Sequence, residues 1–452
     1  MIRPIRAGFV CFGEVNTPAE VIERKRDQAL SDLKPLGLQL TDAGIVSDDS
    51  EYKTADLALS KLRGEELDVL IACVAGWIPS HAVVRVTDPL RHLPILLWGL
   101  CGWMEGEKLV TTADQAGTTA LRPIFEEFGY RFQYVYSIVG EPAPVGQISA
   151  FLEAARAASL LRNARVGSMG YRDMLLYGTQ FEGNSLRAKL GVEVEPFEML
   201  EMVQNLEKLE EPEVASLVEY INANWKFQKE CEPALIERGA RYALAIGTKI
   251  RERHYDAVTL IDVDGMKKLL SFPPAMVFML LDHLYGVQTI PENDVMGSVT
   301  QLMISYLTGE TAAYLEFYEF FKDSVLIGVP DFIPKAVTQG EIKVLPTAFG
   351  LLSASLLNVS SVRPGRVTLS RLIYRRGRYY LHLATGEASA PPAWEECGWT
   401  PPAPQLPSLR VKLDCPVEEF AQKVSSQHTI ISYGDQTQKI KQLCSLLDIE
   451  VI

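Results

Sequence analysis

The stretch from Tyr285 to Pro330 reads YGVQTIPENDVMGSVTQLMISYLTGETAAYLEFYEFFKDSVLIGVP, and the rest of the chain is best interpreted around it. After Glu292-Asn293-Asp294, apolar residues recur at spacings of three and four, which predicts a helix that ends at Gly309. These residues are Val295, Val299, Leu302, Met303, Tyr306 and Leu307. The run from Ala313 to Tyr318 is rich in strand-forming residues and carries Glu316 among apolar neighbours. The stretch therefore predicts a helix and then a strand, with one carboxylate ahead of the helix and one inside the strand.

Two interpretations of these carboxylates are open. In the first, Glu292 caps the helix, where the helix dipole favours a negative charge, and Glu316 faces solvent on an edge strand. Isolated carboxylates are common, so residue types alone favour this interpretation. In the second, both side chains bind a hard metal ion, because carboxylate oxygens suit manganese or magnesium.

The amino-acid sequence of this stretch resembles the metal-site segment of the L-fucose isomerase and L-arabinose isomerase family. In that family a Glu opens an E-N-D segment, a helix ends in L-T-G, and a strand then carries a second acidic ligand. The matching positions are Glu292, Leu307-Thr308-Gly309 and Glu316. The resemblance implies that Glu292 and Glu316 bind a divalent metal, with Mn²⁺ the favoured ion, and that they act as the catalytic acid and base.

The third ligand in the family is a His near the C-terminus, ahead of a helix and a final apolar strand. His428 matches it, with Gln427 in place of the family's Asn and therefore near the substrate. Arabinose isomerases have a fourth ligand, and Asp331 lies near its position. The segment Ser168-Met169-Gly170 is a further point of similarity.

Three more residues are expected to contact substrate. Trp77 follows a strand where fucose isomerases place a Trp that contacts the sugar of a neighbouring subunit. Trp399 lies where fucose isomerases have a substrate-side Trp in a similar Trp-Pro context. Asp262 and Asp264 end the predicted strand from Ala257, and open α/β sheets place ligands at the carboxyl ends of their strands; Asp264 is the one we assign to substrate. The resemblance also implies a homo-oligomer, a trimer or hexamer, with sites at subunit contacts.

Composition limits the classes of function. The chain has 452 residues, 47% apolar and 22% charged, with a net charge of −13. No basic cluster indicates nucleic acid, and the acidic balance disfavours an anionic membrane surface. Seven scattered Cys without a C-x-x-C pair indicate free thiols in a reducing compartment. No apolar stretch is long enough for a bilayer, so we expect a cytoplasmic protein.

The order of predicted elements indicates an α/β protein with two doubly wound parallel-sheet domains, followed by a smaller mostly-β domain. Strands and helices alternate in residues 1–162 and again in 163–334, where the two carboxylates lie. Residues 335–452 lose helical periodicity, contain a hairpin around Arg375-Arg376-Gly377 and carry His428. The first strand is not followed by G-x-G-x-x-G, so no dinucleotide site is expected.

The predicted function is a metal-dependent aldose–ketose isomerase that acts on a monosaccharide or sugar derivative through an enediol. Two alternatives are open. One is a metal-dependent aldolase or epimerase on the same scaffold, since an enediolate serves all of these reactions. The other is a non-enzymatic sugar-binding protein, which has no need for Glu292, Glu316 and His428 to converge. Fold resemblance alone does not decide among them.

Overall fold

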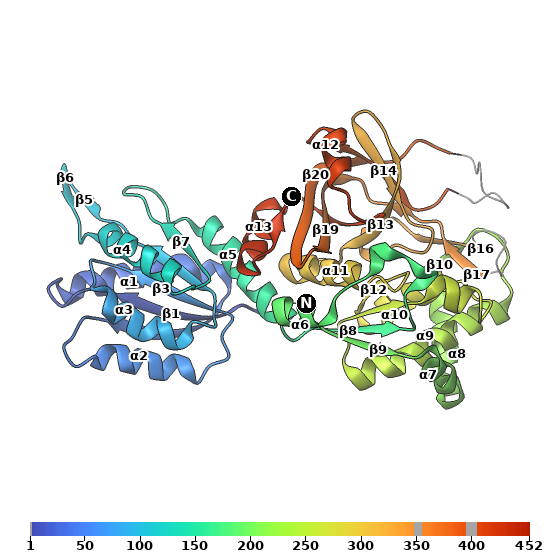
Figure 1. Cartoon of the computed structure of the whole chain (residues 1–452), viewed down its shortest axis with the longest axis horizontal. Helices are drawn as coiled ribbons and strands as arrows, with labels where there is room; N and C mark the ends of the chain where they lie inside the picture. The colour runs from blue at the N-terminus through green and yellow to red at the C-terminus, as the bar shows by residue number, and fades with distance from the viewer. Residues whose placement is uncertain (1, 348–354, 395–404) are drawn as a thin grey trace. The chain divides into compact units, whose positions relative to one another are not determined.

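A computed structural model describes residues 2–347, 355–394 and 405–452 (Figure 1). The chain divides into two compact units. The first contains Met1–Ser159 with Lys439–Leu446, and the second contains Leu160–Gln438 with Leu447–Ile452. The C-terminal helix α13 (Thr437–Leu446) therefore belongs mostly to the first unit, although its flanking strands belong to the second.

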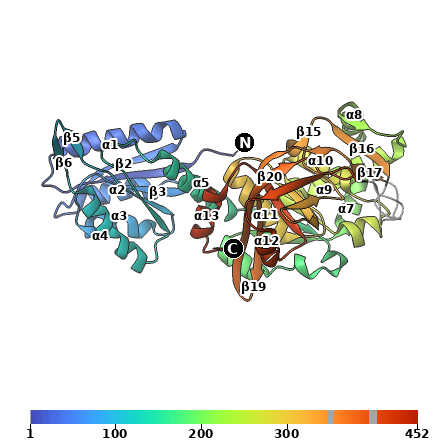
Figure 2. The same cartoon turned by 90° about the horizontal axis from the view of Figure 1, so that it is seen from above.

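The first unit is built on a parallel sheet of order β2-β1-β3-β4-β7. Its strands are β1 (Arg6–Phe12), β2 (Gln39–Val46), β3 (Val69–Val74), β4 (Ile95–Gly99) and β7 (Phe132–Tyr136). Its helices are α1 (Ala19–Leu33), α2 (Lys53–Arg63), α3 (Ser80–Thr87), α4 (Asp114–Glu127) and α5 (Val145–Leu161), and a small hairpin is formed by β5 (Trp103–Glu105) and β6 (Lys108–Val110). All six residues of β3 are buried, which is typical of a parallel strand covered on both faces. In Figure 2, α1 lies on one side of the sheet and α2, α3 and α4 lie on the other.

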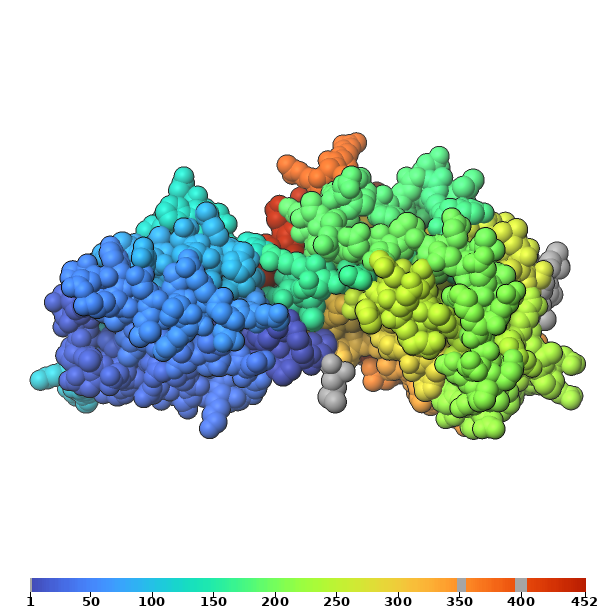
Figure 3. Space-filling view, turned by 90° about the horizontal axis from the view of Figure 1, so that it is seen from below, coloured from blue at the N-terminus to red at the C-terminus, as the bar shows by residue number. Residues whose placement is uncertain are grey.

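The second unit contains a four-stranded parallel sheet of order β12-β11-β8-β9. Its strands are β8 (Arg165–Met169), β9 (Glu193–Phe197), β11 (Ala257–Leu260) and β12 (Gln288–Ile290). The helices around it are α6 (Gly183–Leu190), α7 (Met199–Asn205), α8 (Glu211–Asn224), α9 (Pro233–Arg253), α10 (Ala275–Tyr285) and α11 (Val295–Thr308). Helices α7 to α9 form much of the surface of this unit in the view of Figure 3.

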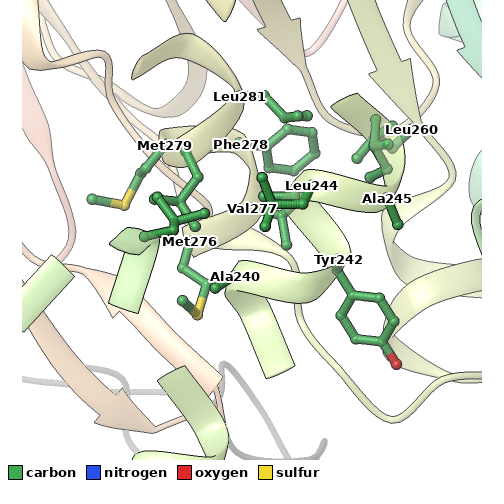
Figure 4. Packing of buried hydrophobic residues seen from close by; sticks show 14 of the residues in the cluster. Ala240, Tyr242, Leu244, Ala245, Leu260, Met276, Val277, Phe278, Met279 and Leu281 are labelled. Atoms are coloured by element: carbon green, nitrogen blue, oxygen red, sulfur yellow. The ribbon is translucent and has the colours of Figure 1, made fainter. Parts of the chain in front are cut away.

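The core of this unit lies between α9, α10 and the parallel sheet. Leu244 of α9, Val277 and Phe278 of α10 and Leu260 of β11 belong to one cluster of buried apolar side chains (Figure 4). A small sheet of β10 (Trp225–Phe227), β16 (Ile342–Thr347) and β17 (Ser355–Asn358) lies against the same helices and contributes Val344 to the cluster.

The C-terminal part is mostly β-structure. The larger sheet has the order β19-β22-β13-β14-β21-β20-β23, and an additional β19–β20 pairing closes six of these strands into a ring. The strands are β13 (Ala313–Phe320), β14 (Ser324–Gly328), β19 (Gly365–Arg375), β20 (Arg378–Ser389), β21 (Ser408–Leu413), β22 (His428–Tyr433) and β23 (Glu450–Val451), with the short helix α12 (Val417–Lys423) beside them. The two-stranded pairing of β15 (Thr338–Gln339) and β18 (Ser361–Val362) completes the described strands.

The structure confirms the coarse fold prediction of a mixed α/β protein with parallel sheets and a mostly-β C-terminal part. The apolar patterns of the sequence predict a helix over Ala19–Leu33 and a strand over Val69–Val74, and α1 and β3 have these bounds to the residue. The elements β2, α2 and α3 were not predicted from the sequence. The edge strand β2 has only two buried residues and lacks a clear apolar pattern.

One predicted strand is shorter than expected. The strand from Ala257 ends at Leu260, and a π-helical turn, Asp262–Lys267, follows it. The carboxylate of Asp173 accepts hydrogen bonds from the backbone N–H groups of Val263 and Asp264, both at 2.7 Å, and so stabilises the turn. None of the helices in the described residues is long and apolar enough to cross a membrane.

Candidate active site

Glu292 lies in an unusual backbone conformation between β12 and α11. Glu292 and Asn293 have φ angles of 62° and 52°, in the left-handed region, which costs about 1–3 kcal/mol for each non-glycine residue. The backbone N–H of Glu292 donates to Asp262 Oδ1 at 2.7 Å. The side chain of Asn293 accepts from Ser168 Oγ at 2.7 Å and donates to the carbonyl of Tyr171 at 2.8 Å. These bonds hold the strained turn in place beside the candidate site.

The carboxylate that caps α11 belongs to Asp294, not to Glu292. Asp294 Oδ1 accepts the N–H of Gly297 at 2.9 Å. Asp294 also forms a two-pronged ion pair with Arg371 of β19, at 2.6 and 3.0 Å, and accepts from the hydroxyl of Tyr314 at 2.9 Å. Burial alone would raise the pKa of Asp294, but the guanidinium of Arg371 lowers it below its ordinary value. Because Asp294 supplies the cap, the interpretation of Glu292 as the helix cap is wrong.

Glu316 and His428 face one another across two neighbouring strands. They are register partners in the antiparallel pairing of β13 with β22. Side chains at such positions lie on the same face of a sheet with their Cβ atoms about 5 Å apart. Because β13 lies between β22 and β14, it is an interior strand, and the interpretation of Glu316 as an edge-strand residue is wrong.

His428 connects this strand pair to the Glu292 turn. Its Nδ1 lies 3.6 Å from Glu292 Oε2, and its ring stacks on Tyr314 with centroids 4.2 Å apart. Gln427 Nε2 donates to the Glu292 carboxylate at 3.2 Å. The structure therefore brings Glu292, Gln427 and His428 together, although 135 residues separate Glu292 from Gln427.

A group of four carboxylates, Asp262, Glu292, Glu316 and Asp331, lies at this position, and two of them contact Lys267. Lys267 Nζ lies 3.0 Å from Asp262 Oδ2 and 3.3 Å from Asp331 Oδ1. Asp331 and Glu292 are 5% and 8% exposed, and Asp262 is completely buried. Glu316 lies near enough to interact electrostatically with Asp331, Lys267 and Glu292. One ammonium group thus faces an excess of carboxylates.

The pKa values of these groups reflect both burial and mutual repulsion. Burial, followed by the charges of Asp262, Asp331 and Glu316, raises the pKa of Glu292 to about 10. Burial and the charge of Asp331 raise the pKa of Glu316 to about 7, although Lys267 opposes the shift. Burial raises the pKa of Asp331 to about 6 against the charge of Lys267.

His428 is shifted in the opposite direction. Burial lowers its pKa to about 3, so the imidazole is neutral at pH 7. Its buried Nδ1 has no hydrogen-bond partner among the described residues. A neutral imidazole nitrogen of this kind is able to bind a metal ion.

The donor set fits a divalent cation in its chemistry. Carboxylate oxygens and a neutral imidazole nitrogen suit ions such as Mn²⁺, and a nearby cation would lower the raised carboxyl pKa values. Within the part of the chain that the structure describes, no group of three or more His, Cys, Asp or Glu side chains is arranged to hold a metal ion. The contacts are instead pairwise, between Glu292 and His428 and across the strands between Glu316 and His428.

The other predicted site residues lie apart from this group. Asp264 accepts from the N–H of Met174 at 2.9 Å and pairs with Lys268, and no described contact joins it to Glu292. Trp77 belongs to the first unit, where it is 41% exposed after β3. Trp399 lies outside the described residues.

Sequence reasoning missed several residues of the site. Lys267, Arg371 and Asp173 were not singled out, although each has a buried carboxylate or backbone partner there. Tyr318 was also missed. Its buried hydroxyl has no hydrogen-bond partner among the described residues, and burial followed by the charges of Glu316 and Asp331 raises its pKa. A lysine three residues after an Asp-x-Asp at a strand end was the only available signal for Lys267.

Comparison with known proteins supports the resemblance. Residues 351–452 match the family model described as L-fucose isomerase, C-terminal domain. No curated protein matches the chain. The matched region contains Arg371, Gln427 and His428, and the family is one of isomerases that act on sugars. The C-terminal residues 351–452 are thus similar to the C-terminal domain of L-fucose isomerases.

Proposed function

We propose that the protein is a metal-dependent aldose–ketose isomerase that converts a monosaccharide or sugar derivative through an enediol. The observation that carries this proposal is the meeting of Glu292, Gln427 and His428, with Glu316 in register opposite His428. The residues come from a turn, an interior strand and a strand start that are distant in sequence. A protein that only binds sugar has no need for Glu292, Glu316 and His428 to converge.

Glu292, Glu316 and His428 would hold the divalent ion, with Mn²⁺ the favoured candidate. When bound, such an ion supplies Lewis-acid stabilisation of the negative charge that develops on the sugar oxygens. Isomerisation requires removal of a proton from C2 of the aldose and delivery of a proton to C1. Both Glu292 and Glu316 are candidates for this transfer, and a carboxyl pKa near 7, as at Glu316, suits proton exchange at neutral pH.

The remaining residues are assigned to the substrate and the assembly. Gln427 is held against Glu292 and can donate to a sugar hydroxyl. We propose that Asp264, Trp399 and Trp77 also contact substrate, with Trp77 contributed by a neighbouring subunit of a trimer or hexamer. A sugar is the expected small-molecule partner, and neither nucleic acid nor a membrane is expected to bind.

The test is proton exchange measured by NMR. The protein is stripped with chelator, Mn²⁺ is added back, and aldoses are incubated in D₂O. Deuterium at C1 or C2 with metal-dependent ketose formation is the expected result. C–C cleavage would favour an aldolase, inversion of a stereocentre would favour an epimerase, and sugar binding without reaction would favour a binding protein.

A further inference from the structure

We infer that a cavity of the second unit, between α8, α10 and β16, binds a small ligand through a primary ammonium group that pairs with Asp282. The cavity is separate from the candidate active site, because Glu292, Glu316 and His428 are not among the described residues that line it. The inference therefore does not depend on the proposed isomerase activity.

The size and the wall of this cavity suit a small organic molecule. Its volume is about 390 Å³, and ligand pockets typically measure about 300–1,000 Å³. Aromatic and aliphatic side chains form most of the wall, and one of them, Met279 of α10, is labelled in Figure 4. These side chains belong to Tyr220, Trp225, Met279, Ile333 and Ile342. Such a wall accommodates the hydrocarbon part of a ligand, while a few polar groups fix its orientation.

Asp282 supplies the negative charge of the cavity. Its side chain is partly buried, and its carboxylate has no hydrogen bond or ion pair within the part of the chain that the structure describes. Burial raises the pKa of Asp282 to about 6, so most of these carboxylates are ionised at pH 7. A carboxylate only accepts hydrogen bonds, and an ammonium group supplies three donors and a positive charge. A ligand with this group therefore matches what Asp282 lacks.

The end of α10 adds to the negative charge. Asp282 lies in the last turn of this helix, where its backbone carbonyl accepts the N–H of Gly286. The carbonyl groups of a last turn carry a partial negative charge, which disfavours a carboxylate and favours a cation. The position of Asp282 is thus unfavourable for an unpaired acid and favourable for a bound ammonium group.

The two basic residues of the cavity do not pair with Asp282. The ring of His283 stacks on Tyr220 with centroids 3.9 Å apart, and burial, followed by the charge of Lys335, lowers the pKa of His283, so the imidazole is neutral at pH 7. Lys335 is exposed and forms no ion pair with Asp282 in the described residues. Lys335 is free to pair with a carboxylate of the ligand, which an α-amino acid carries and a simple amine does not.

The test is binding to the full-length protein at pH 7, measured by saturation-transfer difference NMR titrations. The probes are isopentylamine and L-leucine, which share one carbon skeleton and an ammonium group, and isopentanol is their neutral analogue. Asp282→Asn removes the charge and keeps the size of the side chain. Glu219→Gln is the matched control, because Glu219 is an exposed carboxylate of α8 that does not line the cavity. Circular dichroism checks that each variant is folded.

We expect the tighter of the two ammonium probes to bind the wild type and Glu219→Gln at least about tenfold more tightly than isopentanol, the scale of one hydrogen bond to a charged group. Asp282→Asn should remove this preference. L-Leucine as the tighter probe, with its advantage lost in Lys335→Met, would assign the ligand to the amino acids, and isopentylamine as the tighter probe would assign it to simple amines.

Two results overturn the inference. The first is a wild type that binds none of the probes or does not prefer the ammonium group, and this result counts even if Asp282→Asn fails to fold. The second is a folded Asp282→Asn variant that keeps the wild-type preference, because the ammonium group would then be recognised elsewhere.

Discussion

Two buried lysines, one in each unit, have the same exposure and different surroundings. Lys25 and Lys267 are both 8% exposed. Lys25, on α1, forms an ion pair with the buried Asp114 and donates to Thr112 Oγ1 at 2.8 Å. Lys267 contacts Asp262 and Asp331 and lies in a group that also contains Glu292 and Glu316. Lys25 pairs with one carboxylate, whereas the group that contains Lys267 has four.

This difference separates a structural ion pair at Lys25 from a group at Lys267 that, on the proposed function, also holds a divalent cation. A buried pair in balance stabilises little relative to an apolar replacement, but removing one partner is costly. An excess of buried carboxylates raises their pKa values, as at Glu292 and Glu316, and pKa shifts of this kind cluster at functional sites. The predictions below test whether the two lysines differ in this way.

The largest effect is expected on catalytic activity, at the site that contains Lys267 and the four carboxylates. Glu316→Gln keeps the size of the side chain but removes its ability to exchange a proton and to bind a cation strongly. We expect deuterium exchange into the sugar to fall by about 100- to 10,000-fold, the usual contribution of a general acid or base. The NMR assay in D₂O measures it.

Asp264→Asn serves as the comparison for this variant, because Asp264 lies on the turn that carries Lys267 but pairs with the exposed Lys268. We expect a loss of at most about tenfold there, the scale of a single substrate contact. Equal losses in the two variants would contradict the special role of Glu316.

The next effect concerns Lys25, which pairs with a single carboxylate. Lys25→Met leaves Asp114 buried without its cation, and we expect the first unit to lose about 3–5 kcal/mol of stability. Hydrogen exchange of peptides from β1 and β3 reports the opening of this unit separately. Activity per folded molecule should stay unchanged, and a specific loss of exchange chemistry would show that Lys25 also serves the site.

The pH dependence of the stability of the apo protein tests the raised pKa values in the group of four carboxylates. Folding raises the pKa of Glu316 from its ordinary value to about 7, so the folded state binds more protons than the unfolded state between about pH 4.5 and 7. Stability of the second unit should therefore fall as the pH rises through this window, with Glu316 contributing at most about 3 kcal/mol. Urea unfolding at several pH values measures the slope.

Two comparisons sharpen that measurement. Glu316→Gln should make the slope shallower, and saturating Mn²⁺ should remove the destabilisation at pH 7, because a cation favours the ionised carboxylates. A wild-type stability that rises across this pH range would contradict the raised pKa.

The sequence predicted some parts of the molecule well for physical reasons. The bounds of α1 (Ala19–Leu33) and β3 (Val69–Val74) were met because their apolar patterns are continuous and local. Glu292, Glu316 and His428 were found through the family resemblance and not through spacing. Their contacts depend on the closure of a sheet that joins β13 to β22, which no local pattern encodes.

The rest of the site could not be predicted because its contacts join distant residues. Lys267 reaches Asp331 across 64 residues, and Arg371 reaches Asp294 across 77. The left-handed turn at Glu292 and Asn293 carries no glycine that would mark it in the sequence. The cap was assigned to the wrong acid for the same reason, since Glu292 and Asp294 are both plausible until the backbone angles are known.

The smallest effect is expected at the partly buried ion pair between Arg3 and Asp68 in the first unit. The Asp68 side chain is buried, but Arg3 is 31% exposed and so keeps part of its hydration. Burial acts to raise the pKa of Asp68, yet the hydrogen bonds from Arg3 and from the N–H of Arg6 lower it below its ordinary value. The pair therefore stabilises the folded state above the unfolded-state pKa of about 3.9, and this stabilisation is lost as the pH falls through the lower folded-state pKa.

We expect Asp68→Asn to cost about 1.5 kcal/mol at pH 7, less than Lys25→Met, because the partly exposed Arg3 regains water. Hydrogen exchange of β1 and β3 should show this difference shrinking below about pH 4; a cost as large as that of Lys25→Met would show that burial of one partner is enough to make a pair structural.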